Sequence, residues 1–151
     1  MSQTKAQPAL TIIYQYVKDL SFEAPHLAAL IRTMREAPAV EMALEVRHAP
    51  SSGAGEHEVE LHIKATAKSA SDTFFICELT YGALVALGDE APADTTLMVE
   101  VPRLLFPFAR AIIAEITRES GMPPLIMAPI DFAALYAARQ SAPAPEQTPV
   151  Q

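Results

Sequence analysis

Residues 71–82 read Ser71-Asp72-Thr73-Phe74-Phe75-Ile76-Cys77-Glu78-Leu79-Thr80-Tyr81-Gly82. This run is rich in aromatic and β-branched residues and ends at a glycine, which is typical of a β-strand. Successive side chains of a strand point to opposite faces. We expect one face to pack on the core, and it carries Phe75, Cys77, Leu79 and Tyr81. The other face mixes apolar groups with a carboxylate, as a docking surface would, and it carries Phe74, Ile76, Glu78 and Thr80.

Two earlier stretches, residues 40–47 and 58–65, alternate apolar and polar side chains and are joined by a glycine-containing loop. This pattern predicts an antiparallel hairpin. A further β-prone run covers residues 11–22, so the sequence predicts four strands in a meander with one apolar and one polar face. If pairing of the first strand is regular, one of its faces carries Val17, Asp19, Ser21 and Glu23. The polar face then gathers Glu41, Glu45, Glu58, Glu60 and Glu78, with Asp19 and Glu23 nearby.

Helical patterns flank and follow these strands. Apolar residues at helical spacing predict a short helix over residues 26–36, and a longer one from about Pro107 to Ser120 that follows an extended piece at residues 97–101. Asp131 is a good N-cap for a final helix that reaches about Gln140. Strands first and helices last predict an α+β fold whose helices cover the apolar face. The apolar arc of the long helix is wide enough to contact a second subunit, and we include Phe108 and Ile112 in that contact.

The bulk composition narrows the class of protein. A chain of 151 residues with 50% hydrophobic content fits one domain, expected over residues 11–140, between disordered ends at residues 1–10 and 141–151. The formal charge of -7 argues against a nucleic-acid binder and favours basic partners. One cysteine makes no internal disulfide, and no signal peptide or membrane span is visible. We therefore expect a cytoplasmic protein that does not insert into a membrane.

The sequence contains no recognisable catalytic or cofactor motif. There is no Gly-x-Ser-x-Gly elbow, phosphate-binding loop or Cys-x-x-Cys pair. His57 and His62 are five apart on a strand and face opposite ways, so they do not build a metal site. We expect no catalytic residue, metal or cofactor. The acidic face has two readings: charges that keep an exposed sheet soluble, or a surface that steers a basic protein partner. Ile76, an apolar group among the charges, favours the second.

Four motifs then suggest a family, since they occur in its order. They are Lys18-Asp19-Leu20-Ser21-Phe22-Glu23-Ala24-Pro25, then Phe75-Ile76-Cys77-Glu78, then Leu105-Phe106-Pro107-Phe108-Ala109-Arg110, and finally Leu125-x-x-Ala128-Pro129-Ile130-Asp131-Phe132-x-x-Leu135-Tyr136. On these motifs the chain resembles the SecB protein-export chaperone family from about Tyr14 to Tyr136. The resemblance implies a homotetramer, a dimer of dimers with helices sandwiched between two outward-facing sheets.

The resemblance also implies an activity and its residues. It implies an ATP-independent holdase chaperone that binds unfolded precursor proteins and delivers them to the SecA motor ATPase. The family's motor-docking positions fall on Asp19, Glu23, Ile76 and Glu78. The positions that affect tetramer assembly fall on Cys77, Leu79 and Tyr81, of which only the cysteine is identical.

Unfolded clients should bind through many weak apolar contacts. We place the client groove among Leu125, Met127, Phe132, Leu135 and Tyr136, although the same residues would also serve to hold the last helix to the core. Two other functions stay open. One is a hot-dog-like acyl-thioester enzyme. That fold has its long helix early, between strands, whereas the long helix of this sequence follows all the strands. The carboxylate that this helix would offer for catalysis is Glu115. The other is a SecB-like chaperone of a toxin–antitoxin system.

Overall fold

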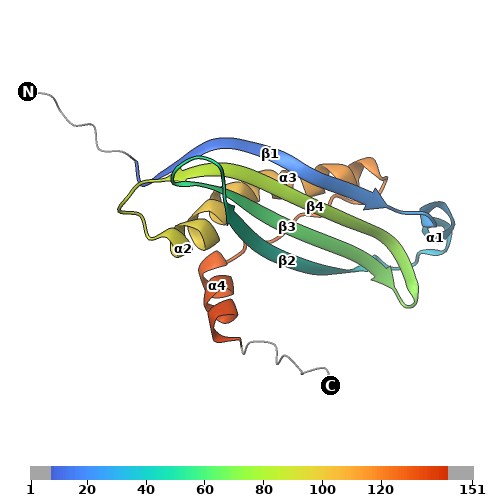
Figure 1. Ribbon diagram of the computed structural model, residues 1–151. Coiled ribbons are helices and arrows are strands. Elements are labelled where there is room, and N and C mark those ends of the chain that lie inside the picture. The colour runs from blue at the N-terminus through green and yellow to red at the C-terminus, as the bar shows by residue number, and fades with distance from the viewer. Residues whose placement is uncertain (1–7, 143–151) are drawn as a thin grey trace, which may run out of the picture.

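Four antiparallel strands form the sheet of the computed structural model (Figure 1). They are β1 (Leu10–Glu23), β2 (Ala39–Pro50), β3 (Glu56–Ser69) and β4 (Asp72–Leu87), in the order β1-β4-β3-β2. Strands β2 to β4 follow one another as hairpins, but β1 pairs with β4. The predicted four-strand meander is therefore wrong for β1, because the chain crosses from one edge of the sheet to the other before β2, as in a Greek key.

The structure describes residues 8–142. Most of the two ends that we expected to be disordered, residues 1–10 and 141–151, therefore lies outside the described residues. The parts that are described belong to regular elements or their flanks, since β1 begins at Leu10 and the last helix ends at Ser141.

A bulge in β1 decides which of its side chains reach the polar face. Val17 pairs with Tyr81, but the next pair is Asp19 with Thr80, so Lys18 is an extra residue. Paired residues share a face of the sheet, and one extra residue reverses the faces that follow. Val17 therefore lies on the apolar face, and the prediction that it shares a face with Asp19 is wrong. Beyond the bulge, the polar face receives Asp19, Ser21 and Glu23.

The two faces of β4 are largely as predicted. Cys77 and Leu79 are fully buried on the apolar face, whereas Ile76 and Glu78 remain partly exposed on the other. Phe74 is the exception, because it is 3% exposed although we placed it on the outer face. It falls where the register shifts, between the pairs Ala67–Phe75 and Lys68–Thr73, so it has no direct partner on β3.

The long helical segment begins earlier than the sequence suggested. α1 spans Leu27–Thr33, within the predicted stretch. A continuous helical segment then comprises α2 (Ala93–Thr95), the π-helix η1 (Thr96–Glu100) and α3 (Val101–Glu119). The predicted extended piece at residues 97–101 is wrong, and Pro107 lies inside α3 rather than in its first turn. Burial decides this region, because η1 packs into the core with Leu97, Met98 and Val99 and such contacts override β-propensity.

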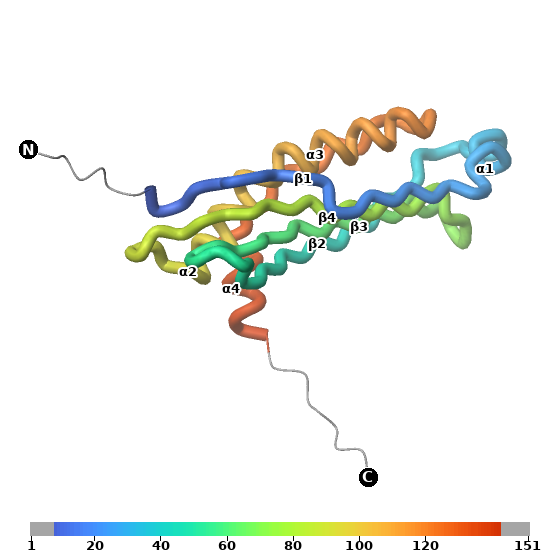
Figure 2. The backbone as a smooth tube through the Cα atoms, turned by 45° about the horizontal axis from the view of Figure 1, so that its top comes forward, coloured from blue at the N-terminus to red at the C-terminus, as the bar shows by residue number. Residues whose placement is uncertain are grey.

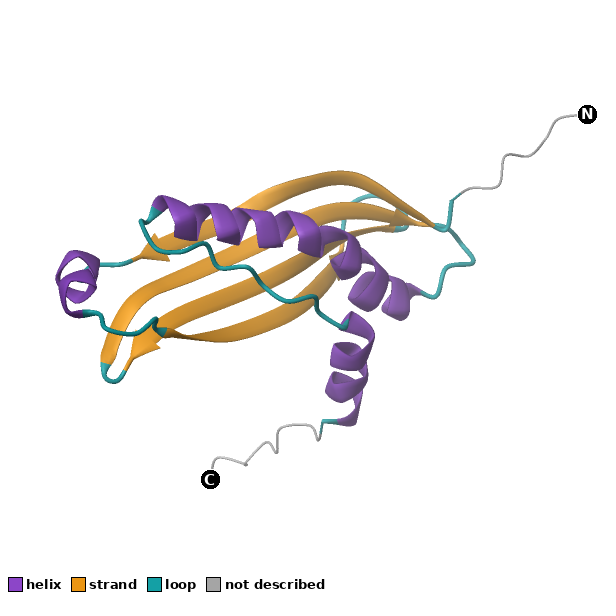
Figure 3. Cartoon of the chain, turned by 180° about the vertical axis from the view of Figure 1, so that it is seen from behind, coloured by secondary structure: helices purple, strands orange, loops and turns teal. Residues whose placement is uncertain are grey.

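The final helix, α4 (Phe132–Ser141), starts where predicted. The Asp131 carboxylate accepts a hydrogen bond from the backbone N–H of Ala134 at 3.0 Å, which caps the helix. Figure 3 shows α3 lying across one face of the sheet and α4 projecting away beside β2. The predicted cover of the apolar face is therefore supplied by α3, while α4 stands at the edge of the sheet. Within residues 8–142, no helix has the length and apolar character that a bilayer crossing requires.

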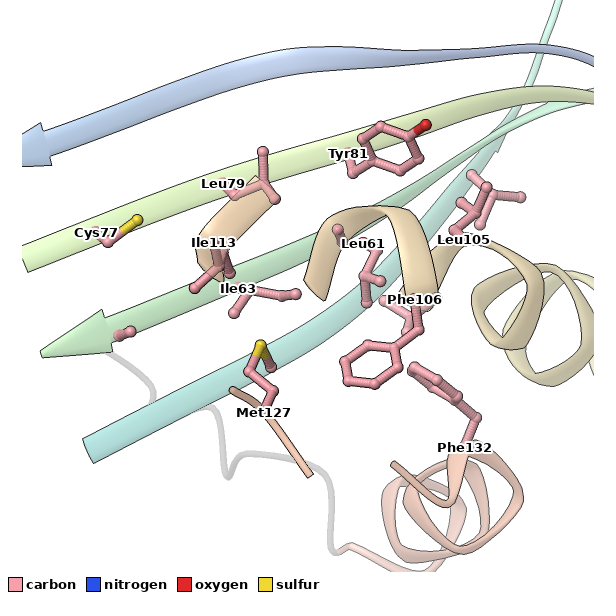
Figure 4. Packing of buried hydrophobic residues seen from close by; sticks show 14 of the residues in the cluster. Leu61, Ile63, Cys77, Leu79, Tyr81, Leu105, Phe106, Ile113, Met127 and Phe132 are labelled. Carbon is pink, nitrogen blue, oxygen red and sulfur yellow. The ribbon is translucent and has the colours of Figure 1, made fainter. Parts of the chain in front are cut away.

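The core lies between α3 and the two central strands, as Figure 4 shows. Leu61 and Ile63 of β3 and Leu79 of β4 are fully buried, as are Leu105 and Ile113 of α3. The rings of Phe106 and Phe132 meet edge to face, with centroids 5.9 Å apart. This last contact joins the start of α4 to α3.

α3 leaves both edges of the apolar face uncovered. It contacts β3 and β4, and the apolar side chains of the two edge strands remain exposed. Figure 2 shows α3 running lengthwise on one side of the sheet. On β1 these are Val17 and Leu20, and on β2 they are Val40 and Met42, each between 39% and 46% exposed. The single chain thus presents an apolar strip on each side of α3.

Candidate functional site

The polar side of the sheet, which we name the outer face, brings the predicted docking residues together. Glu23 pairs with Ile76, and Asp19 with Thr80, so both β1 carboxylates lie beside β4. Glu78 pairs with Ser21, between these two rows. Asp19, Glu23, Ile76 and Glu78 therefore form one continuous surface on two neighbouring strands, which we name the acidic patch.

Most other carboxylates of the outer face have basic partners. The Arg47 guanidinium lies 2.7 Å from the Glu45 carboxylate, and the Lys68 ammonium lies 3.2 Å from that of Glu41. In the acidic patch, Glu78 lies 3.3 Å from Lys64 and 3.8 Å from the His62 imidazole. Asp19 and Glu23 have no such partner among residues 8–142. The patch is therefore the part of β1 and β4 where negative charge is least compensated.

A hydrogen-bonded cluster joins β1 to β3 at the other end of the outer face. The Lys18 ammonium contacts the carboxylates of Glu58 and Glu60, and the Tyr16 hydroxyl donates to Glu58. The donation from Lys18, then that from Tyr16, lowers the pKa of Glu58 to about 2. Burial, with the Glu58 hydrogen bond second, raises the pKa of Tyr16 to about 12. One ammonium thus lies between two carboxylates, and these hydrogen bonds tie β1 to β3 across β4.

The positions expected at subunit contacts differ in exposure. Cys77, Leu79 and Tyr81 are buried within the single chain, where burial also raises the pKa of the Cys77 thiol. Phe108, by contrast, is 51% exposed on α3, and Ile112 is half-buried. The three β4 residues therefore offer no open surface in the single chain.

An apolar hollow of about 440 Å³ lies between α3 and β1 next to these residues. Ile112 and Ile116 line it from the helix, and Leu20 lines it from the strand. Leu20 was missed by sequence reasoning. Alternation with Asp19 and Ser21, which lie on the outer face, already places Leu20 on the apolar face, where it pairs with Leu79.

The expected client-groove residues divide into two groups. Met127 and Phe132 are 3% and 1% exposed, so within this chain they pack in the core and offer no open surface. Leu135 and Tyr136 line a cleft of about 190 Å³ between α4 and β2. Arg139 closes the cleft, because its guanidinium donates to the Val46 carbonyl of the edge strand at 2.9 Å.

A buried hydroxyl positions the segment that leads to α4. Thr117 is fully buried in α3, and its oxygen accepts the backbone N–H of Leu125 at 2.8 Å. The next residue, Ile126, is 60% exposed, and sequence reasoning did not single it out. The sequence signal for this contact was Thr117 itself, a single polar residue on the apolar side of the long helix. Buried polar groups need a hydrogen-bond partner.

Comparison with known protein families assigns the chain to one of them. The model of the family described as preprotein translocase subunit SecB matches residues 3–143. The chain belongs to the SecB family. The protein-export protein SecB of Hyphomonas neptunium is 45% identical over 132 residues, which cover 85% of this chain and 77% of that protein. The SecB of Granulibacter bethesdensis is 43% identical over 147 residues, which cover 91% of this chain and 85% of that protein.

A solved structure shows the same fold at low identity. It is the SecB-like chaperone of Mycobacterium tuberculosis in complex with a ChAD peptide from an antitoxin. The match has a TM-score of 0.64 at 10% identity and covers 81% of this chain and 88% of that one. At this identity the likeness concerns the fold alone, and the export-protein relatives carry the family assignment.

As a SecB-family protein, the chain is a chaperone of protein export. The family comprises chaperones rather than enzymes, and the carboxylate weighed for an enzyme is unremarkable: Glu115 is 62% exposed on α3 and pairs with Arg118. His57 pairs with Val85 and His62 with Thr80, so the two imidazoles stand on opposite faces. Within residues 8–142, no group of three or more His, Cys, Asp or Glu side chains could hold a metal ion.

Proposed function

We propose that this SecB-family protein is an ATP-independent holdase of the cytoplasm that delivers unfolded precursor proteins to the SecA ATPase. The observation that supports this most directly is the division of the sheet. Its apolar side keeps exposed strips along β1 and β2, while its outer side carries the acidic patch. Cargo and motor would then bind to opposite faces, and neither would displace the other.

Client binding uses the strip along β2. Val40 and Met42 are exposed there, the cleft of Leu135 and Tyr136 lies beside the same strand, and Ile126 is exposed on the segment before α4. Such contacts are weak one by one. Several copies on one assembly would hold a long unfolded chain by avidity.

Assembly uses the strip along β1. Leu20 and Ile112 meet at the hollow beside α3, and Phe108 is exposed on the same helix. Pairing these surfaces between copies would bury them and leave the outer faces pointing away from the centre. We propose a tetramer on this basis, arranged as a dimer of dimers.

Motor docking uses the acidic patch. Long-range attraction would orient a basic surface of SecA on Asp19, Glu23 and Glu78. Exposed ion pairs contribute only about 0–1 kcal/mol each, whereas burying one aliphatic side chain contributes about 1.5–3 kcal/mol. Ile76 would therefore provide much of the affinity, and the carboxylates the orientation and the sensitivity to salt.

Two measurements test the proposal. Light scattering should show that the protein suppresses aggregation of a reduced, unfolded polypeptide without ATP. Calorimetric titration should show that SecA binds, and that Glu78→Gln and Ile76→Ser each weaken binding while client holding is unchanged. Glu45→Gln is the matched control, because it removes one charge from the same face away from the patch. Unchanged SecA affinity in both patch variants would refute motor docking at this surface.

A further inference from the structure

A hollow of about 550 Å³ opens between α1 and the turn that joins β3 to β4. Figure 1 shows α1 and this turn at the same end of the sheet. Leu30 and Ala29 line the hollow from α1, and Ile76 and Thr73 line it from β4. The remaining lining residues are Glu23, Pro25, His26, Ser71 and Asp72.

The hollow is continuous with the acidic patch. Ile76 and Glu23 line the hollow and belong to the patch, and they pair with each other across β4 and β1. A segment lying on the patch would therefore reach the hollow without leaving the surface. The hollow adds apolar surface from Leu30, Ala29 and Pro25 to what the patch alone offers through Ile76.

The charge around the hollow is negative and uncompensated. Glu23 and Asp72 line it, no lysine or arginine does, and neither carboxylate has an ion-pair partner among residues 8–142. Elsewhere on the outer face, Lys18, Arg47, Lys64 and Lys68 neutralise nearby glutamates. An apolar floor with a free acidic rim is complementary to an apolar side chain that is flanked by lysine or arginine.

We propose that this hollow is a receptor for such a basic, apolar-tipped segment of the protein that docks on the acidic patch. This inference rests on the proposed docking function and specifies the chemistry of the partner. The apolar side chain inserts between Leu30 and Ile76, and the cationic groups beside it meet Glu23 and Asp72. The patch thereby selects a segment by shape as well as by charge.

Two neighbouring alanines of α1 provide a matched test. Ala29 lines the hollow and Ala28 does not, and both are exposed. Ala29→Trp fills the hollow from its wall, and Ala28→Trp places the same ring outside it. With purified SecA as the probe, we expect Ala29→Trp to raise Kd at least about tenfold, the order expected when one aliphatic contact is lost. Ala28→Trp should bind like the unmodified protein.

The charged rim is tested separately. Asp72→Asn should weaken SecA binding several-fold and reduce its dependence on salt, because one exposed ion pair contributes about 0–1 kcal/mol. Glu36→Gln, outside the hollow, is the control. Client holding is measured on every variant.

The outcomes separate this inference from the proposed function. If Glu78→Gln weakens SecA binding but the two tryptophan variants bind alike, docking at the patch stands and the receptor is wrong. If Ala29→Trp weakens client holding and leaves SecA binding unchanged, the hollow takes client chains, and the inference is again wrong. If SecA does not bind the unmodified protein, both fall together.

Discussion

The ring of Tyr81 on β4 lies parallel to that of Phe108 on α3, with centroids 6.3 Å apart and an interplanar angle of 11°. Tyr81 is buried and donates its hydroxyl hydrogen to the Gln15 side chain at 3.3 Å, whereas Phe108 is half-exposed. The buried ring thus supports one side of the exposed ring. This contact gives a physical reason why a change at a buried β4 position would alter the surface that we propose for assembly.

Replacing Phe108 with alanine should weaken the proposed tetramer. The side chain is 51% exposed in the single chain, so its removal leaves most of the core intact while deleting apolar surface from the proposed contact. Multi-angle light scattering should show the unmodified protein at four times 16.3 kDa, about 65 kDa. The Phe108→Ala protein should give smaller species as it is diluted.

Tyr81→Phe tests whether the ring or the hydroxyl of Tyr81 matters for the Phe108 contact. It keeps the stacked ring and removes only the hydroxyl, so the assembly should remain that of the unmodified protein. Leu135→Ala, an equally simple truncation of an exposed residue on α4, controls for loss of apolar surface in general. An undiminished tetramer in Phe108→Ala at low concentration would exclude this residue from the interface.

Gly82 should not tolerate a side chain, because the Tyr16 ring lies across it. A Cβ atom at Gly82 would come within 2.8 Å of Cε2 and 2.9 Å of Cζ of Tyr16. Gly82→Ala must therefore displace the ring and its hydrogen bond to Glu58, and we expect a loss of about 1–3 kcal/mol in unfolding free energy. Urea unfolding measures it. In a Tyr16→Ala background the same change should cost clearly less, and an equal cost would show that another contact is responsible.

The faces of the strands could be predicted from sequence because their physical cause is local. Alternation in β3 and β4 separates Cys77 and Leu79 from Ile76 and Glu78 whatever lies around the strands. The N-cap at Asp131 was equally readable, since a carboxylate followed by a helical pattern satisfies free backbone N–H groups. Alternation thereby places Ile76 and Glu78 together on the outer face, while the resemblance to the SecB family added Asp19 and Glu23.

The misplaced features depend on distant contacts. Residues 97–101 have the β-prone side chains of a strand, but the core buries Leu97 and Val99 in a π-helix. The bulge at Lys18 leaves no signature in the sequence of β1, because it is defined by the pairing with β4. The hollow beside α1 is likewise formed by segments distant in sequence, residues 23–30 and 71–76.

Acid should remove a contribution to stability that Glu58 makes at neutral pH. Its pKa in the folded chain is about 2, below the usual 4.5, because Lys18 and Tyr16 donate hydrogen bonds to the carboxylate. A lowered pKa means that the contribution is complete above pH 4.5 and disappears as the pH falls toward 2. Since the side chain is 37% exposed, we expect only about 0–1 kcal/mol for each ion pair.

Glu58→Gln tests this by urea unfolding at several pH values. The difference in stability between the unmodified protein and the variant should be constant from pH 7 to about 5 and shrink below it. Added salt should reduce it, because the pair is solvent-exposed. Glu56→Gln, on the same strand and in no ion pair among the described residues, should show little such dependence. A Glu58→Gln difference that persists unchanged at pH 2.5 would contradict the assignment of the low pKa to this contact.

Thr117 should position the segment that precedes α4, and a change of one atom tests this. Its hydroxyl donates to the Ile113 carbonyl and accepts the Leu125 N–H, both at 2.8 Å, in a fully buried site. Thr117→Val keeps the shape but leaves the Leu125 N–H without its acceptor, which costs about 1–3 kcal/mol. The segment should then loosen, and hydrogen exchange at the Leu125 amide should become faster.

Thr117→Ser separates this effect from packing. Serine keeps the hydroxyl and loses a methyl group, so it should reduce stability while the Leu125 amide stays protected. Client holding should correlate with the protection of the Leu125 amide from exchange, and not with the free energy of unfolding. The reason is that Ile126 is exposed on the same segment and belongs to the proposed client surface. Aggregation suppression should therefore fall in Thr117→Val and persist in Thr117→Ser. Equal protection of the Leu125 amide in both variants would mean that the segment is held by its apolar contacts instead.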